Sequence, residues 1–164
     1  MLVNNAGIQN WGNIADSGFY AKSKSGVSIN FLAHAHFTTL FMSLPSQTTV
    51  INVTSGLALV PFSKVQIYCG TKVFVRSFTL SLRHILKPKG VEVIEMIPPA
   101  INTDLGGKGI HEGLPTVSEF VDSIFQQMKE VKTEVTFGSS ETRAKANNET
   151  IPSYFNKLNP APLG

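Results

Sequence analysis

Tyr68 and Lys72 are the residues of this chain whose types and spacing are best suited to chemistry. They are four apart in a stretch that predicts a helix from residue 67 to about residue 86, so both side chains lie on one face. A phenol, with a pKa of about 10, exchanges protons poorly at neutral pH. A neighbouring ammonium lowers that pKa, and we expect Lys72 to make Tyr68 a usable general acid or base. The same spacing also fits an alternative without chemistry, in which Tyr68 is an exposed tyrosine and Lys72 a solvated lysine.

Apolar, β-branched segments on either side of this helix predict the strands that position it. They occupy residues 1–3, 49–55, 91–97 and 134–138. Two further helices are predicted over residues 28–43 and from Thr116 or Ser118, as cap, to about residue 129. Residues 8–27 predict a loop, or a loop with a weak helix, and residues 139–159 predict a helix or a loop tail. This alternation indicates a parallel sheet with right-handed crossovers.

Length, charge and cysteine content exclude several classes of protein. A chain of 164 residues is long enough for one domain, and its net charge of +3 is spread without a basic run or a nucleic-acid-binding motif. The single cysteine, Cys69, cannot form an internal disulfide, which suits a reducing compartment. No membrane-spanning stretch or secretory signal is recognisable, so we expect a cytoplasmic protein.

Two other features favour packing over a functional site. His34 and His36 are two apart and do not share a helical face, so we predict no metal site there. Trp11 stands alone in a polar segment, where a packing role is favoured over a place in a pocket wall.

Taken together, a set of motifs resembles the short-chain dehydrogenase/reductase family. It comprises Asn4-Asn5-Ala6-Gly7, Asn30, Ser55, Tyr68 and Lys72, with the serine thirteen residues before the tyrosine. The segment from Pro98 to Thr103 is similar to the family's Pro-Gly segment, with Pro99 in place of the glycine. Residues 94–107 and 134–138 look most like the subgroup related to the short-chain oxidoreductase of bacterial D-alanyl-lipoteichoic-acid operons.

The resemblance implies a catalytic role for four residues. Tyr68 would transfer the proton at the carbonyl or alcohol oxygen, and Lys72 would lower the tyrosine pKa and bind the nicotinamide ribose. Ser55 would hold the substrate oxygen. Asn30 would keep a helix irregular and support a water that links Lys72 to solvent. As isolated residues, Ser55 could equally end a strand and Asn30 could cap a helix.

The resemblance also implies contacts with NAD or NADP. Asn5, Ala6 and Gly7 would lie along its adenosine side. The segment beginning at Pro98 would hold its carboxamide through the Ile101 backbone and the Thr103 side chain, although Thr103 alone could simply begin a helix.

The family's T-G-x-x-x-G-x-G turn, which binds the pyrophosphate at a helix N-terminus, has no match in this chain. Gly106-Gly107-Lys108-Gly109 follows no strand directly, and we interpret it as part of a mobile substrate loop. We therefore expect residues 1–164 to form a single, truncated α/β domain: an incomplete Rossmann-like, doubly wound parallel sheet of about four strands with flanking helices. Residues 2–4 would be a bare edge, and cofactor affinity would be weak or absent.

Two functions follow. The first is an NAD(P)-dependent oxidoreductase that transfers hydride between nicotinamide and a small carbonyl or alcohol substrate. The alternative is a non-catalytic scaffold that self-associates through the helices carrying Asn30 and Tyr68, as members of the family pair in dimers. The apolar residues of these helices would serve that interface or the core equally well; they are Phe31, Phe37, Leu40, Phe41, Val73, Phe74, Phe78 and Leu82.

Overall fold

The computed structural model describes residues 1–44 and 48–160, which fold around one parallel sheet. The strands are β1 (Leu2–Asn4), β2 (Thr49–Val53), β3 (Glu92–Ile97) and β4 (Glu134–Thr136), in the order β1-β2-β3-β4. In register, Val3 lies beside Ile51, and Ile51 beside Ile94. The predicted α/β sheet is confirmed, with β2 and β4 each two residues shorter at their carboxyl ends than expected.

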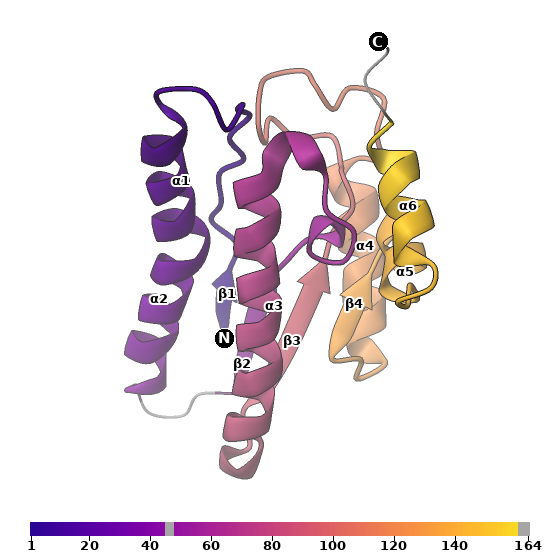
Figure 1. Cartoon of the computed structure of the whole chain (residues 1–164). Helices are drawn as coiled ribbons and strands as arrows, with labels where there is room; N and C mark the ends of the chain where they lie inside the picture. The colour runs from indigo at the N-terminus through magenta and orange to yellow at the C-terminus, as the bar shows by residue number, and fades with distance from the viewer. Residues whose placement is uncertain (45–47, 161–164) are drawn as a thin grey trace.

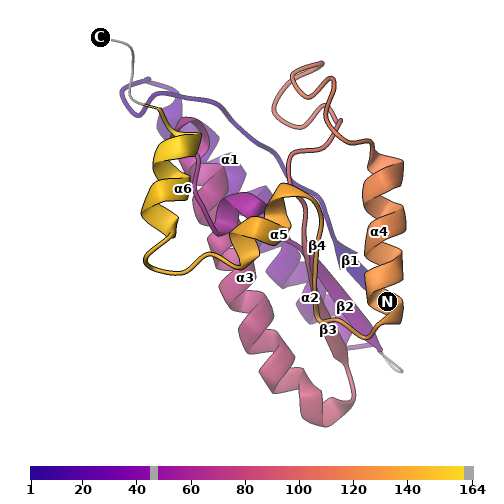
Figure 2. The same cartoon turned by 90° about the vertical axis from the view of Figure 1, so that its right-hand side faces the viewer.

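Helices cover both faces of the sheet (Figures 1 and 2). One face carries α1 (Phe19–Val27), α2 (Ala33–Met42) and α3 (Gln66–Leu86), and the other carries α4 (Val117–Lys129). Two short helices follow β4: α5 (Ser139–Ala144) and α6 (Ile151–Leu158). The sheet is therefore the middle layer of three.

Alternating strand residues build one core on each face, as the period of two requires. Val50 and Val93 pack with Leu86, Phe41 and Leu82 beneath α2 and α3. Ile51, Ile94 and Val135 point the other way and pack with α4; its residues in this cluster are Phe120 and Ile124.

Residues 19–27, which lie in the segment predicted as a loop or a loop with a weak helix, form the regular nine-residue helix α1. A π-helical turn (Ser28–Leu32) joins α1 directly to α2, so the helical run extends from residue 19 to residue 42. Tertiary packing explains the difference: a Cβ on Gly26 would lie 3.3 Å from Ile67 Cγ2, so the glycine lets α1 approach α3 closely. Residues 139–159, predicted as a helix or loop tail, contain two helices.

Residues typical of helix ends are found at two helices. Thr116 caps α4 in a reciprocal capping box with Glu119. After α3, a short 3₁₀ turn ends at Gly90, whose left-handed φ of 68° a glycine accommodates without strain.

β1 lies at one edge of the described sheet, as predicted. Val3, which faces the α4 side, is 45% exposed. Within the described residues, none of the helices combines the length and apolarity that crossing a membrane requires.

Candidate active site

A pocket of about 630 Å³ lies where the loops after the strands converge. Its walls come from the segments after β1, β2 and β3, from the start of α3 and from α5 and α6. In an open parallel sheet this is the edge where ligands bind. The fold therefore brings residues far apart in sequence to one cavity.

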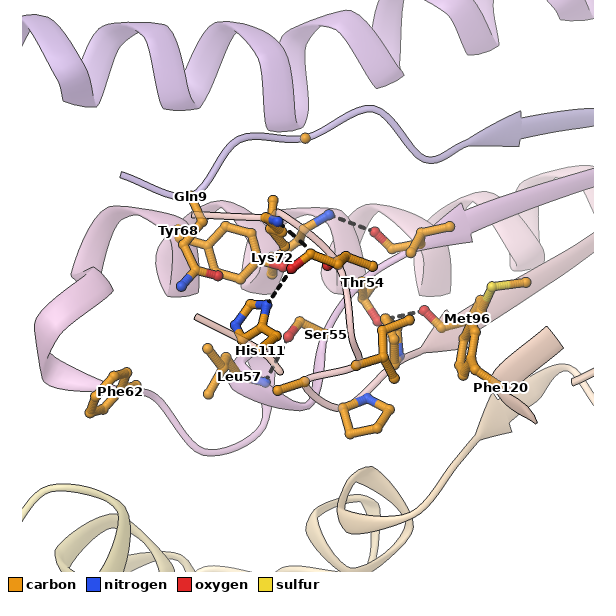
Figure 3. A pocket seen from close by; sticks show the side chains of 18 of the residues that line it. Gln9, Thr54, Ser55, Leu57, Phe62, Tyr68, Lys72, Met96, His111 and Phe120 are labelled. Carbon is orange, nitrogen blue, oxygen red and sulfur yellow. Dashed lines mark hydrogen bonds between the residues drawn. The ribbon is translucent and has the colours of Figure 1, made fainter. Parts of the chain in front are cut away.

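Ser55, Tyr68 and Lys72, three of the four residues proposed from the sequence to act in catalysis, all line this pocket (Figure 3). Tyr68 and Lys72 share the inner face of α3, with Lys72 Nζ 5.6 Å from the Tyr68 ring centroid. Ser55 follows β2 directly, and its side chain lies close enough to the Tyr68 hydroxyl to lower the pKa of Tyr68. The Ser55 Oγ also accepts a hydrogen bond from the Leu57 backbone N–H at 3.1 Å and so caps a 3₁₀ turn.

Burial is the main cause of the shifted pKa values of Tyr68 and Lys72. It raises the pKa of Tyr68 to about 12, with the nearby Ser55 side chain acting in the opposite direction. Burial also lowers the pKa of Lys72 to about 8, while its Nζ donates to the Val53 carbonyl at 2.8 Å. Loss of hydration is the largest influence on the pKa of Tyr68 in this structure, and the expectation that Lys72 lowers it stays a prediction.

Asn30 lies behind the pocket wall rather than in it. It is fully buried in the π-helical turn, so its helix is irregular as expected. Its Oδ1 accepts from the Ile8 N–H at 2.8 Å, and its Nδ2 donates to the Ile8 carbonyl at 2.9 Å and to Thr71 Oγ1 at 3.1 Å. Asn30 thus joins the loop after β1 to the first turns of α3, between Tyr68 and Lys72.

All six residues expected to contact only the cofactor line the pocket: Asn5, Ala6, Gly7, Pro98, Ile101 and Thr103. A Cβ on Gly7 would lie 3.5 Å from Asn30 Oδ1 and 3.7 Å from Lys72 Nζ. Gly7 therefore leaves open a space directly against the two polar side chains.

His34 supports this loop from α2. Its Nε2 donates to the Ala6 carbonyl at 2.8 Å, and among the described residues nothing pairs with its buried Nδ1. Burial lowers the pKa of His34, which favours the neutral ring. His34 is thus a packing residue, as expected, with a specific backbone partner.

Several further residues line the pocket outside the predicted site. Trp11, for which packing was favoured over a place in a pocket wall, lines the pocket, and its indole N–H donates to the Gly106 carbonyl at 3.0 Å, joining the loops after β1 and β3. His111 donates through Nδ1 to the Thr103 carbonyl at 3.0 Å. Arg143, from α5, also lines the pocket. They stand alone in polar segments, so no local pattern could identify them.

Residues 1–44 and 48–160 contain no group of three or more His, Cys, Asp or Glu side chains placed to hold a metal ion.

Comparison with known proteins gives the same family from sequence and from structure. The family model for short chain dehydrogenases matches residues 1–112. The chain is 34% identical over 172 residues to the uncharacterized oxidoreductase DltE of Bacillus subtilis; the match covers 97% of this chain and 67% of that protein.

Solved structures show the same fold. A Burkholderia cenocepacia short-chain dehydrogenase, in complex with NADP, has a TM-score of 0.79 and 21% identity; the match covers 94% of this chain and 68% of that one. A Burkholderia phymatum short-chain dehydrogenase/reductase, in complex with NAD, has a TM-score of 0.70 and 19% identity over 93% and 66% of the two chains. From the family model and the Bacillus relative, this chain belongs to the short-chain dehydrogenase family of NAD(P)-dependent oxidoreductases.

Proposed function

We propose that the pocket is the active site of an oxidoreductase that interconverts a small carbonyl compound and its alcohol, with Tyr68 as the proton-transfer residue. The observation that carries the proposal is the shared position of Ser55, Tyr68 and Lys72 in one pocket wall. Ser55 already contacts the Tyr68 side chain, so a substrate oxygen beside both hydroxyls would be held by one and protonated by the other.

The protonation states of Tyr68 and Lys72 suit this proton transfer. With its pKa at about 12, Tyr68 holds its proton at neutral pH and is ready to donate it from Oη to a carbonyl oxygen. Lys72 is largely charged at that pH, and its Nζ, fixed by the Val53 carbonyl, lies near the ring on which negative charge then develops. In the opposite direction, Tyr68 accepts the proton of the alcohol.

We propose NAD or NADP as the cofactor, which would supply or accept the hydride. The space left open by Gly7, against Lys72 and Asn30, supports a nucleotide lying in this pocket. Asn5, Ala6 and Gly7 would lie along the adenosine side, Lys72 would bind the nicotinamide ribose, and Pro98, Ile101 and Thr103 would hold the carboxamide. The NADP and NAD complexes of the two Burkholderia proteins support this assignment.

Calorimetric titration with NADH and NADPH tests the cofactor site. We expect binding weaker than the low micromolar range, because the chain has no match to the family's phosphate-binding turn. Gly7→Leu should remove it, since the added side chain fills the space beside Lys72 Nζ. Gly18→Leu, where a Cβ meets nothing within 4 Å, is the matched control. Equal binding by Gly7→Leu and wild type would contradict the site.

A second candidate, self-association as a scaffold, is favoured by the apolar side chains that α2 and α3 leave exposed. Phe37, Leu40, Val73 and Phe74 lie on the surface, whereas Phe41 and Leu82 pack into the core. The Phe31 and Phe74 rings stack at 5.4 Å and join the two exposed sets. We propose a second copy of this chain as the partner, compatible with either function.

A further inference from the structure

Arg143 is a cation in the pocket wall that the oxidoreductase proposal does not use. It is partly buried, and its guanidinium makes no ion pair or hydrogen bond with any residue the structure describes. The two arginines of α3 differ: Arg76 pairs with Glu95 at 2.6 Å, and Arg83 donates to the carbonyls of Val93 and Thr133. A half-buried guanidinium usually has such partners.

The fold fixes the Arg143 side chain against the segment that carries Ser55. The neighbouring Ser140 on α5 donates through Oγ to the Ile97 carbonyl, which anchors the helix at the end of β3. A Cβ on Gly56 would lie 3.1 Å from Arg143 Nη1 and 3.4 Å from Cδ. Gly56 thus provides the surface on which the guanidinium rests, one residue after the serine that contacts Tyr68.

The surroundings of Arg143 favour an anion. Lys72 and Arg143 are the Lys and Arg side chains in the pocket wall, and the described wall includes no aspartate or glutamate. Burial lowers the pKa of Arg143, so the charged guanidinium is partly desolvated there without a compensating carboxylate in the described wall. A bound anion would supply that compensation.

We propose that Arg143 is a specificity residue that binds a carboxylate of the substrate, so that the substrates are oxo acids and hydroxy acids. The guanidinium is a planar fork that matches a carboxylate with two parallel hydrogen bonds. A substrate held in this way at one end would present its carbonyl oxygen to Ser55 and Tyr68 at the other. This inference rests on the proposed function and names the substrate class of the same site.

Direct binding tests the proposal without turnover. Pyruvate, acetoacetate and levulinate place a carboxylate at increasing distance from a ketone, and their methyl esters are neutral counterparts. We would measure their dissociation constants by ligand-observed NMR, without NAD(P), for wild type, Arg143→Gln, Arg143→Lys and Lys145→Gln. Lys145, exposed at the end of α5, controls for loss of one positive charge. Circular dichroism confirms that each variant is folded.

We expect at least one of the acids to bind wild type more tightly than its ester. Arg143→Gln should raise the dissociation constant of that acid by roughly tenfold or more, as loss of a charged hydrogen-bond donor does, and leave that of the ester unchanged. Arg143→Lys should retain part of the affinity, and Lys145→Gln all of it. Equal binding of acids and esters by wild type, or full affinity in Arg143→Gln, would overturn the proposal.

The anion that Arg143 binds could also be a phosphate of the cofactor. A second titration, with NADPH, distinguishes a cofactor phosphate from a substrate carboxylate. If Arg143 serves the substrate, Arg143→Gln binds NADPH as wild type does. A loss of NADPH affinity with unchanged binding of the acids would overturn the carboxylate assignment. Because the NMR measurement needs no hydride transfer, failure of the oxidoreductase proposal would be seen separately, as absence of turnover with the acids that bind.

Discussion

Lys72 is an ammonium-bearing side chain placed where water is almost excluded. Only 3% of the residue is exposed, and within residues 1–44 and 48–160 its Nζ has one acceptor, the Val53 carbonyl. Its pKa, lowered from 10.5 to about 8 by burial, means that folding disfavours the charged form. Such a group opposes stability at neutral pH, as functional groups in pockets often do.

From the lowered pKa of Lys72 we predict a specific pH dependence of the free energy of unfolding. Between about pH 8 and pH 10.5 the unfolded chain binds more protons at Lys72 than the folded chain does, so Lys72 contributes a rise in stability with pH there, by up to about 1.4 kcal/mol per pH unit. In Lys72→Met this rise should disappear. Urea unfolding at several pH values measures it, with the exposed Lys64→Met as control. An unchanged pH profile in Lys72→Met would contradict the shifted pKa.

The central residues of the candidate site could be predicted from their spacing in the sequence. The outer wall residues of the pocket and the pKa values could not. Ser55, Tyr68 and Lys72 follow from a strand end and one helical face. Arg143 and His111 enter the pocket from a short helix and a loop whose positions depend on contacts far along the chain, Ser140 with Ile97 and His111 with Thr103. The raised pKa of Tyr68 arises from burial, which no sequence spacing reveals.

At the level of elements, α3 is fixed to the sheet by a buried ion pair. Arg76 contacts Glu95 on β3 at 2.6 Å, and Glu95 is fully buried with a second hydrogen bond from Thr54 Oγ1 at 2.8 Å. The pair lies one turn of α3 beyond Lys72. It therefore helps to set the position of the helix that carries the proposed catalytic residues.

Removing one partner of this pair should be costly. Arg76→Ala leaves Glu95 buried and without its cation, which should lower the free energy of unfolding by about 3 kcal/mol. Lys132→Ala, which breaks the exposed pair with Glu130, should cost below about 1 kcal/mol. Urea denaturation of the two variants makes the comparison. Similar losses in both would show that the Arg76 pair does not fix α3.

Some helices could be predicted from sequence patterns, whereas others depend on tertiary packing. The strands and α3 follow from apolar runs bounded by Pro and Gly, and α4 follows from its capping box. Helix α1 does not, because its polar, Gly-containing sequence becomes helical by packing against α3, with Gly26 beside Ile67. The π-helical turn likewise depends on the long-range hydrogen bonds of Asn30 with Ile8.

Across the whole molecule, the apolar side chains exposed on α2 and α3 contrast with the packed faces beneath them. Phe74 is 57% exposed on this surface, and Phe125, on α4 across the sheet, is 59% exposed. The two phenylalanines therefore form a matched pair for testing which face associates.

We predict that the wild-type chain dimerises through α2 and α3. Phe74→Glu should shift sedimentation toward the monomer, because it introduces a charge into the apolar contact, while Phe125→Glu should sediment as wild type does. A monomeric wild type at every concentration, or a dimer undisturbed by Phe74→Glu, would contradict this interface.

The most direct test of the proposed activity is turnover of a panel of ketones, including the three oxo acids, at saturating NADH and NADPH. Tyr68→Phe keeps the ring and removes the proton, so we predict a fall in rate on the order of a hundredfold or more in a folded protein. Tyr20→Phe, at an exposed tyrosine of α1, should retain full activity. Equal rates for Tyr68→Phe and wild type, or no turnover by wild type, would contradict the oxidoreductase assignment.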